Sequence, residues 1–167
     1  DPDGYVAVEA INSLTPECLK QNRLPKSVTQ LTIDDFKTIL RNDTKGRFHM
    51  KENDSGDWLI RANQGHSRGS TIRDDGLLEG IIRPLGECLH GTNREAWESI
   101  KDSGLNRMNR NHIHMAQGRP GQEGVISGMR NTAEIIIYVD MKRSMAAGIK
   151  FFMSRNGVIL TRGIDES

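Results

Sequence analysis

The sequence is poor in cysteine, in aromatic residues and in long apolar runs. Its 167 residues include two cysteines, Cys18 and Cys88, and only 5% are Phe, Trp or Tyr. Two distant cysteines make neither a disulfide framework nor a zinc motif, so the expected compartment is the reducing cytoplasm or nucleus. No run reaches the roughly 20 apolar residues of a membrane span, and the acidic start has no signal-peptide pattern. These absences predict a soluble globular protein without a membrane partner.

Acidic residues are missing from three stretches, although the formal net charge is only +1. Residues 58–73, 103–122 and 141–164 contain no Asp or Glu, and all three contain Arg. Such sorting can build a positive cleft on a nearly neutral protein, and the cleft would attract an anion. The alternative is that these basic residues form ordinary solvated faces.

The first part of the chain has the pattern of a helix followed by a hairpin. Thr32 and Asp35 form a helix-start signature, and apolar residues then recur at helical spacing until about residue 41. Residues 46–52 and 58–62 alternate as two strands around a polar turn. A helix followed by such a hairpin is typical of a winged-helix module, which commonly meets nucleic acid or another protein.

Residues 68–84, rich in Gly, Arg and Asp, predict a connector to a second part of different composition. There, Asn93 is placed to cap a helix that Gly104 closes. Short strands are expected at residues 88–92, 112–115, 133–140, 151–153 and 158–160. The predicted fold class is therefore α+β, with a mixed, mainly β second domain.

Four of the five histidines lie in three short runs beside Gly, Ser, Thr or Asn: they are His66, His90, His112 and His114. Grouped with arginines, they indicate a pocket for an anionic, sugar-containing ligand. His112 and His114 are two apart on a predicted strand, so they should share a face with Arg110. A metal pair is one alternative, but no Asp, Glu or Cys flanks them and Arg110 would repel a cation, so no metal is expected. Core histidines without a function are the other alternative.

Further candidate ligand-binding residues near these histidines are glycines, whose backbone is accessible, and residues with amide or hydroxyl side chains. They are Gly91 and Thr92 after His90, Gln64 and Ser67 around His66, and Ser127, Gly128 and Arg130 in a possible phosphate-holding turn. Glycine permits the close approach of a ligand, and such turns can bind anions through backbone N–H groups. Each run alone is equally typical of an ordinary turn.

The ordered set of these runs resembles the motifs of the NAD-dependent RNA 2′-phosphotransferases, which finish tRNA splicing. The matching segments are 47–49, 64–67, 90–92, 110–114, 124–130 and 156–160, and their detail is most similar to the fungal members of the eukaryotic branch. The resemblance implies a winged-helix RNA-binding lobe at residues 1–67, a connector at 68–84, and an ADP-ribosyltransferase-like NAD-binding lobe at 85–167. It also implies a monomer that binds NAD and 2′-phosphorylated tRNA.

The resemblance assigns a role to each candidate residue. Arg47 and Arg110 match the two catalytic arginines of these segments, and Gln64, His66 and Ser67 would bind substrate phosphates. The residues expected to bind NAD are His90, Gly91, Thr92, His112, His114, Ser127, Gly128, Arg130 and Val158. Which of the two neighbouring histidines contacts NAD stays open. Many relatives that modify proteins carry glutamate at the position of Val158, so an apolar residue there favours an acceptor that is already anionic.

One feature departs from the family pattern. The usual Leu-Arg-His helix should precede Gly4-Tyr5, but the sequence starts at Asp1, after that place. Three alternatives to the full reaction follow: an ADP-ribosyltransferase that stops after capping a nucleic-acid phosphate, a catalytically incomplete fragment that binds RNA or NAD, and a winged-helix DNA regulator. The regulator would leave the histidine runs unexplained.

Overall fold

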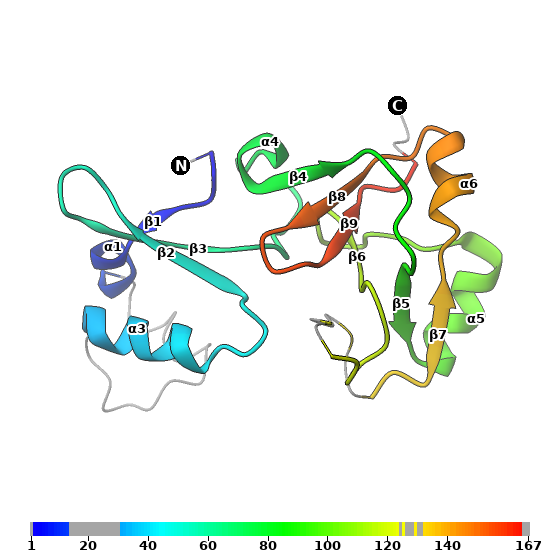
Figure 1. The fold of residues 1–167 in the computed structure, drawn as a ribbon, viewed down its shortest axis with the longest axis horizontal. Coiled ribbons are helices and arrows are strands. Elements are labelled where there is room, and N and C mark those ends of the chain that lie inside the picture. Colours follow the sequence, from blue (N-terminus) through cyan, green and yellow to red (C-terminus); the bar gives the residue numbers. More distant parts are fainter. Residues whose placement is uncertain (1, 14–30, 124, 126–128, 130–131, 165–167) are drawn as a thin grey trace.

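The computed structural model describes residues 2–13, 31–123, 125, 129 and 132–164. These residues form a mixed α/β fold whose strands pair antiparallel in three small sheets (Figure 1). The first sheet belongs to the N-terminal part of the chain, which ends at about residue 62, and the other two belong to the C-terminal part. The expected mixture of helices and antiparallel strands is confirmed.

The N-terminal part is a three-stranded sheet with helices packed on it. The strands are β1 (Val6–Ala7), β2 (Phe48–Glu52) and β3 (Trp58–Ala62), in the order β1-β3-β2, and the helices are α1 (Val8–Asn12) and α3 (Ile33–Asn42). Val8, Phe36 and Ile60 form their shared buried core. Burying these side chains from two helices and the central strand fixes which face of the sheet α3 covers.

Helix α3 begins and ends where the local sequence signals predict. The Thr32 hydroxyl accepts a hydrogen bond from Asp35 N, and the Asp35 carboxylate accepts one from Thr32 N, which completes a capping box. These bonds hold the pKa of the Asp35 carboxyl below its usual value. The helix ends at Asn42, so the chain turns into β2 through residues 43–47, and this turn carries Arg47.

The C-terminal part contains a four-stranded and a two-stranded sheet. The larger sheet has the order β4 (Leu78–Ile81), β8 (Phe151–Ser154), β9 (Ile159–Thr161) and β6 (Ile113–Met115). The smaller pairs β5 (Leu89–Thr92) with β7 (Ile135–Tyr138). A bridge between Leu89 and Ala116 joins β5 to the chain just after β6, so the two sheets diverge from this point. The space between them becomes one of the cavities described below.

The helices of the C-terminal part are α4 (Asp74–Leu77), α5 (Arg94–Ser103) and α6 (Met141–Ala146). Asn93 caps α5, accepting a hydrogen bond from Ala96 N, and Gly104 follows its end, as predicted. Helix α6, capped by Asp140, was not predicted. Residues 68–84, predicted as a connector, contain α4 and β4, and β4 pairs with β8. Four-residue elements such as α4 and β4 are not stable alone, so the local sequence predicts them poorly. The pairing of β4 with β8 determines the structure of this segment.

The two parts are joined by backbone hydrogen bonds just after β3. Asn111 N donates to His66 O at 2.9 Å, and Arg68 N donates to Asn109 O at 3.0 Å. A β-bridge between Ser67 and Arg110 lies between these two bonds. Arg110 is therefore placed by a short stretch of pairing between the segment after β3 and the segment before β6.

Candidate functional site

Two adjoining cavities contain most of the predicted site residues. The β5–β6 cavity, of about 390 Å³, is lined by residues that include His90, Gly91, Thr92, Arg110 and His114. The Arg47 cavity, of about 340 Å³, is lined by residues that include Arg47, Gln64, Arg110, His114 and Val158. Arg110 and His114 line both cavities, so the two spaces meet at these side chains. Arg47, from the N-terminal part, thus lies around the same spaces as Arg110 and His114, from the C-terminal part.

Arg47 is held at the edge of its cavity by Asp43. The Asp43 carboxylate accepts hydrogen bonds from the backbone N–H of Arg47 and from Phe48 N, and its Oδ1 lies 2.9 Å from Arg47 Nη1. The Asp43 side chain is only 6% exposed, whereas that of Arg47 is 53% exposed. One edge of the guanidinium is therefore fixed by the carboxylate, and its remaining N–H groups, which have no other partner among the described residues, can bind an anion.

Two asparagines fix the turn that carries Arg47. Asn63 N donates to Arg47 O and Asn63 Nδ2 donates to Gly46 O, both at 2.7 Å. Asn156, in the turn between β8 and β9, donates from Nδ2 to Lys45 O at 2.8 Å. Three successive backbone carbonyls are thus held, one of them by the C-terminal part of the chain. No local sequence pattern identifies Asp43 or Asn63, whereas Asn156 lies in a segment that carries the family resemblance.

His114 presents an unpaired nitrogen where the two cavities meet. Its Nδ1 lies 3.0 Å from the carbonyl oxygen of His112, which can only accept, so Nδ1 carries the hydrogen. Burial, and next the charge of Arg110, lower the pKa of His114 to about 4, so the ring is neutral at pH 7. Its Nε2 is buried and has no hydrogen-bond partner in the described part of the chain. The ring therefore holds an acceptor nitrogen that is shielded from solvent and has no donor among the described residues.

His90 is oriented in the same way. Its Nδ1 lies 2.9 Å from the carbonyl oxygen of His114 and donates to it, so the rest of the ring faces the β5–β6 cavity. The space expected beside Gly91 for a ligand is filled by the chain itself. A Cβ at Gly91 would lie 2.6 Å from Met129 Sδ and 3.0 Å from Ala133 Cβ. Glycine is needed here because Met129 packs against the strand.

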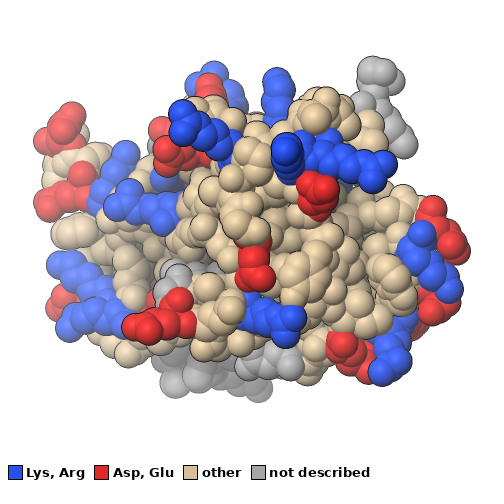
Figure 2. All heavy atoms as spheres, turned by 45° about the vertical axis from the view of Figure 1, so that its right-hand side comes forward, with Lys and Arg blue, Asp and Glu red and all other residues tan. Residues whose placement is uncertain are grey.

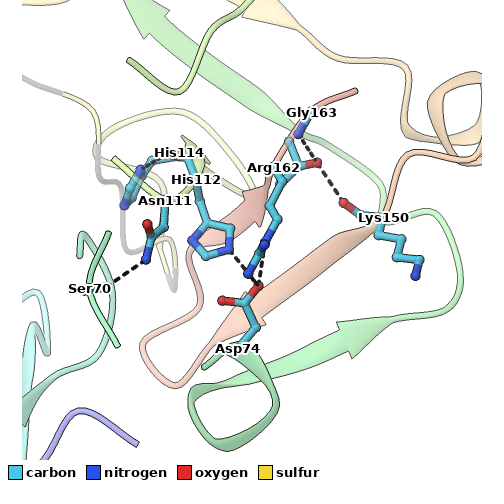
Figure 3. Close-up of polar contacts among 9 residues, drawn as sticks. Ser70, Asp74, Asn111, His112, His114, Lys150, Arg162 and Gly163 are labelled. Atoms are coloured by element: carbon cyan, nitrogen blue, oxygen red, sulfur yellow. Dashed lines mark hydrogen bonds and ion pairs between the residues drawn. The ribbon is translucent and has the colours of Figure 1, made fainter. Parts of the chain in front are cut away.

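His112 does not share the site with His114, as Figure 3 shows. Its ring is buried, its Nε2 lies 3.1 Å from Asp74 Oδ2, and it packs edge-on against Phe152. The same Asp74 oxygen lies 2.9 Å from Arg162 Nη2. The prediction that the two histidines share one face is wrong because β6 begins at Ile113, so alternation along the strand does not include His112. Of the two histidines, His114 is the one that lines the cavities.

The remaining predicted residues lie around the site or outside the described part. Gln64 lines the Arg47 cavity, and Val158, 1% exposed, lines that cavity rather than the β5–β6 cavity. His66 and Ser67 line neither; burial lowers the pKa of His66, whose Nε2 lies 3.2 Å from Ala62 O, and Ser67 bridges to Arg110. Ser127, Gly128 and Arg130, predicted to bind NAD, lie outside the described residues.

The described residues show neither a metal centre nor a membrane span. No group of three or more His, Cys, Asp or Glu side chains that could hold a metal ion is found among them. Nor is any helix in the described ranges long and apolar enough to cross a membrane. The site is defined instead by arginine, imidazole and backbone groups around two joined cavities, which is a chemistry suited to phosphates and sugars.

Comparison with known proteins assigns the chain to a family. Residues 1–163 match the RNA 2′-phosphotransferase family, Tpt1 / KptA. The chain is 43% identical over 166 residues to tRNA 2′-phosphotransferase 1 of Danio rerio, covering 96% of this chain and 68% of that protein. It is 37% identical over 163 residues to the putative tRNA 2′-phosphotransferase of Schizosaccharomyces pombe, covering 98% and 41%. It is also 36% identical over 160 residues to the tRNA 2′-phosphotransferase of Saccharomyces cerevisiae, covering 92% and 69%.

The chain belongs to the RNA 2′-phosphotransferase family, a family of transferases that process tRNA. It spans about two fifths to two thirds of the length of these relatives. The expected affinity with the fungal branch is not supported, because the zebrafish protein is more similar to this chain than either yeast protein.

Proposed function

We propose that this chain removes the internal 2′-phosphate from spliced tRNA by transferring it to NAD. The products are mature RNA, nicotinamide and ADP-ribose 1″,2″-cyclic phosphate. The observation that carries the proposal is that Arg110 and His114 line both cavities. A reaction between two polyanions needs two binding spaces that meet at the reacting atoms, and cations there to hold both. The β5–β6 cavity receives NAD, and the Arg47 cavity receives the RNA 2′-phosphate.

The groups of the β5–β6 cavity suit a dinucleotide. His90 and His114 offer ring nitrogens, Thr92 offers a hydroxyl, and Arg110 stands at the boundary with the second cavity. The Nε2 of His114 is shielded from solvent and has no described partner, so a small movement of its neighbours on NAD binding would let a ribose hydroxyl donate to it. Because this ring is neutral at pH 7, it adds no charge that would compete with Arg110 for phosphate.

In the first step, an oxygen of the RNA 2′-phosphate attacks C1″ of NAD. The bond from C1″ to the nicotinamide nitrogen breaks, and its electron pair leaves with neutral nicotinamide. The nucleophile is already anionic, so no carboxylate base is required, and a glutamate would repel it. In the described part of the chain Arg110 has no carboxylate partner, and Asp43 holds only one edge of Arg47. Both arginines are therefore able to position the phosphate.

In the second step, the ribose 2″-oxygen attacks the phosphorus of the RNA-2′-phospho-ADP-ribose intermediate. The bond from phosphorus to the RNA 2′-oxygen breaks, and the proton lost from the 2″-hydroxyl ends on the RNA 2′-hydroxyl. Negative charge accumulates on the phosphoryl oxygens as the new bond forms. Arg47 and Arg110 stabilise this charge, and an interaction of this kind is worth about 2.7–4 kcal/mol.

We also propose identities for the two parts of the fold. The sheet of β1, β2 and β3 with α1 and α3 corresponds to a winged-helix RNA-binding lobe. The sheets that form the β5–β6 cavity correspond to an ADP-ribosyltransferase-like lobe. A monomer located in the cytoplasm or nucleus stays a prediction.

The test is incubation with NAD and an oligonucleotide that carries one internal 2′-phosphate. Release of nicotinamide, loss of the RNA phosphate and appearance of ADP-ribose 1″,2″-cyclic phosphate are expected together. Arg110→Ala should lower kcat by about 10²- to 10³-fold, while Lys142→Ala, at an exposed position on α6, should not change it. Nicotinamide release with a stable RNA–ADP-ribose product would show an enzyme that stops after the first step. No nicotinamide release would refute the proposed function.

A further inference from the structure

A second basic surface lies on the face of the three-stranded sheet opposite α3. Met50 packs into the core against α3, so alternation along β2 turns His49 and Lys51 to the other face. Tyr5 lies on that face, with its hydroxyl 2.6 Å from His49 Nδ1. His49 has no role in the proposed mechanism.

Three permanent cations surround the Tyr5–His49 pair. Lys51 Nζ lies 4.1 Å and the Arg61 guanidinium 4.5 Å from the centre of the Tyr5 ring. Arg155, in the turn between β8 and β9, lines a cavity together with Arg61. Burial, and then the charges of Arg155, Arg61 and Lys51, lower the pKa of His49, so this imidazole is mostly neutral at pH 7. Positive charge from both parts of the chain is therefore concentrated at one place.

Lys51 and Arg155 are the cations of this group that are exposed to a ligand. Both are exposed, and in the part of the chain that the structure describes neither has a carboxylate within ion-pair distance. Arg61, in contrast, donates to the carbonyl oxygens of Asp3 and Gly76, so its role is to hold these segments. Two acidic residues, Asp75 and Glu79, line the cavity beside Arg61 and Arg155.

Basic and acidic side chains are mixed on one face of the molecule. On the face drawn in Figure 2, basic and acidic side chains are interspersed at the periphery, and the centre is mostly neither. A group of cations without ion-pair partners among the described residues can instead attract an anion.

This surface continues from the proposed reaction site. Arg47 directly precedes β2, whose residues His49 and Lys51 share one face, and residues two apart on a strand are separated by about 7 Å. Arg155 directly precedes Asn156, which lines the Arg47 cavity. A strand of RNA that places its 2′-phosphate at Arg47 and Arg110 can therefore extend past Lys51 and Arg155. The aromatic ring on this face, Tyr5, is buried, so the surface offers charge rather than a platform for stacking bases.

We propose that Lys51 and Arg155 bind phosphodiester groups of the RNA strand that flanks the reacting 2′-phosphate. This inference rests on the proposed function for the identity of the RNA. Interactions of this kind position the strand and do not read its sequence. They add affinity that depends on salt concentration and on the length of the RNA.

The test compares Lys51→Ala, Arg155→Ala and the double variant with the unchanged chain and with Lys142→Ala, which removes an exposed lysine on α6. Binding of a fluorescent single-stranded RNA of a dozen nucleotides is measured by anisotropy at several salt concentrations, which requires no turnover. We expect Kd to rise roughly threefold for each single variant and about tenfold for the double variant. The slope of log Kd against log salt should fall by about 0.7 for each phosphate that is no longer neutralised.

A kinetic comparison separates this surface from the reaction site. Two substrates carry the same internal 2′-phosphate, one in a trinucleotide and one in the longer RNA. The double variant should raise KM for the longer RNA and leave KM for NAD unchanged. Binding and slope that match those of Lys142→Ala, or equal rises in KM for both RNA lengths, would overturn the inference. Failure of all turnover by the unchanged chain would count against the proposed function, while the anisotropy measurement would still decide on this surface.

Discussion

The asparagine that connects the two parts of the chain provides the sharpest test of how Arg47 is positioned. Asn156 is 7% exposed, and its Nδ2 donates to Lys45 O at 2.8 Å. Its Oδ1 accepts from the hydroxyl of Ser154, also at 2.8 Å. Asn156→Ala removes both bonds and leaves the Lys45 carbonyl without this donor. The loss of each hydrogen bond costs about 0.5–1.5 kcal/mol, so the unfolding free energy should fall by about 1–3 kcal/mol.

The effect on the reaction should be larger than the effect on stability. Lys45 O lies two residues before Arg47, and its release lets the turn move relative to the β5–β6 cavity. A displacement of about 1 Å can cost 10²-fold in rate, so kcat should fall ten- to hundredfold. Asn156→Asp should behave like Asn156→Ala, because a carboxylate keeps the acceptor but cannot donate to the carbonyl.

The assay combines thermal unfolding with single-turnover transfer from a 2′-phosphorylated RNA, at a temperature where every variant is folded. Asn53→Ala is the matched control, since the Asn53 side chain makes three hydrogen bonds within the β2–β3 turn and lines neither cavity. It should lower the melting temperature without lowering kcat. A kcat for Asn156→Ala within twofold of the unchanged chain would show that the bond to Lys45 only stabilises the fold, and would refute its positioning role.

Three further predictions concern the neighbourhood of the cavities. Because the pKa of His114 is lowered from 6.5 to about 4, the unfolded chain takes up a proton that the folded chain does not. The stability that this group contributes is complete above pH 6.5 and decreases as the pH falls toward 4, by on the order of 2 kcal/mol at pH 5. The unfolding free energy of His114→Asn, measured with denaturant, should therefore depend less on pH than that of the unchanged chain. Asp74→Asn should lower the unfolding free energy by about 2 kcal/mol, because it removes the carboxylate that both His112 and Arg162 contact. Asp75→Asn, at an exposed site, should change the unfolding free energy by less than about 0.5 kcal/mol. Equal effects of the two substitutions in calorimetry would contradict the stabilising role given to Asp74. Gly91→Ala should cost about 1–3 kcal/mol through overlap with Met129, and Met129→Ala in the same chain should recover most of the loss.

Capping residues and alternating strands around polar turns predicted the elements that are stabilised by residues close in sequence. The capping residues Thr32 and Asn93 mark the starts of α3 and α5 in both sequence and structure. The hairpins were visible because their strands alternate and their turns are polar. Elements 74–81 were not predicted, since four-residue elements depend on pairing with a distant strand. His112 points away from the cavities because β6 begins one residue after it, and sequence patterns predict such strand boundaries poorly.

The residues that hold the site were harder to predict than the residues that form it. Arg47 and Arg110 belong to segments that carry the family resemblance, and Arg110 also lies in a stretch without acids, so a shared cationic site could be expected. Asp43 and Asn63 act through backbone groups of the turn at 45–47, and those hydrogen bonds exist only once the helix, the hairpin and the turn are folded together. A polar residue that satisfies buried backbone groups leaves no spacing pattern in the sequence.

The structure also separates arginines that the sequence presents as equivalent. Arg162 pairs with the buried Asp74, and its charge contributes to the fold. Arg110 instead joins the two parts of the chain through its backbone, by the bridge to Ser67, which leaves its guanidinium without a carboxylate among the described residues. An interface built from ion pairs would have neutralised the cations that the reaction needs. Joining the parts through carbonyls, amides and asparagines keeps the charge of Arg110 available for an anion, because neutral hydrogen bonds do not offset it.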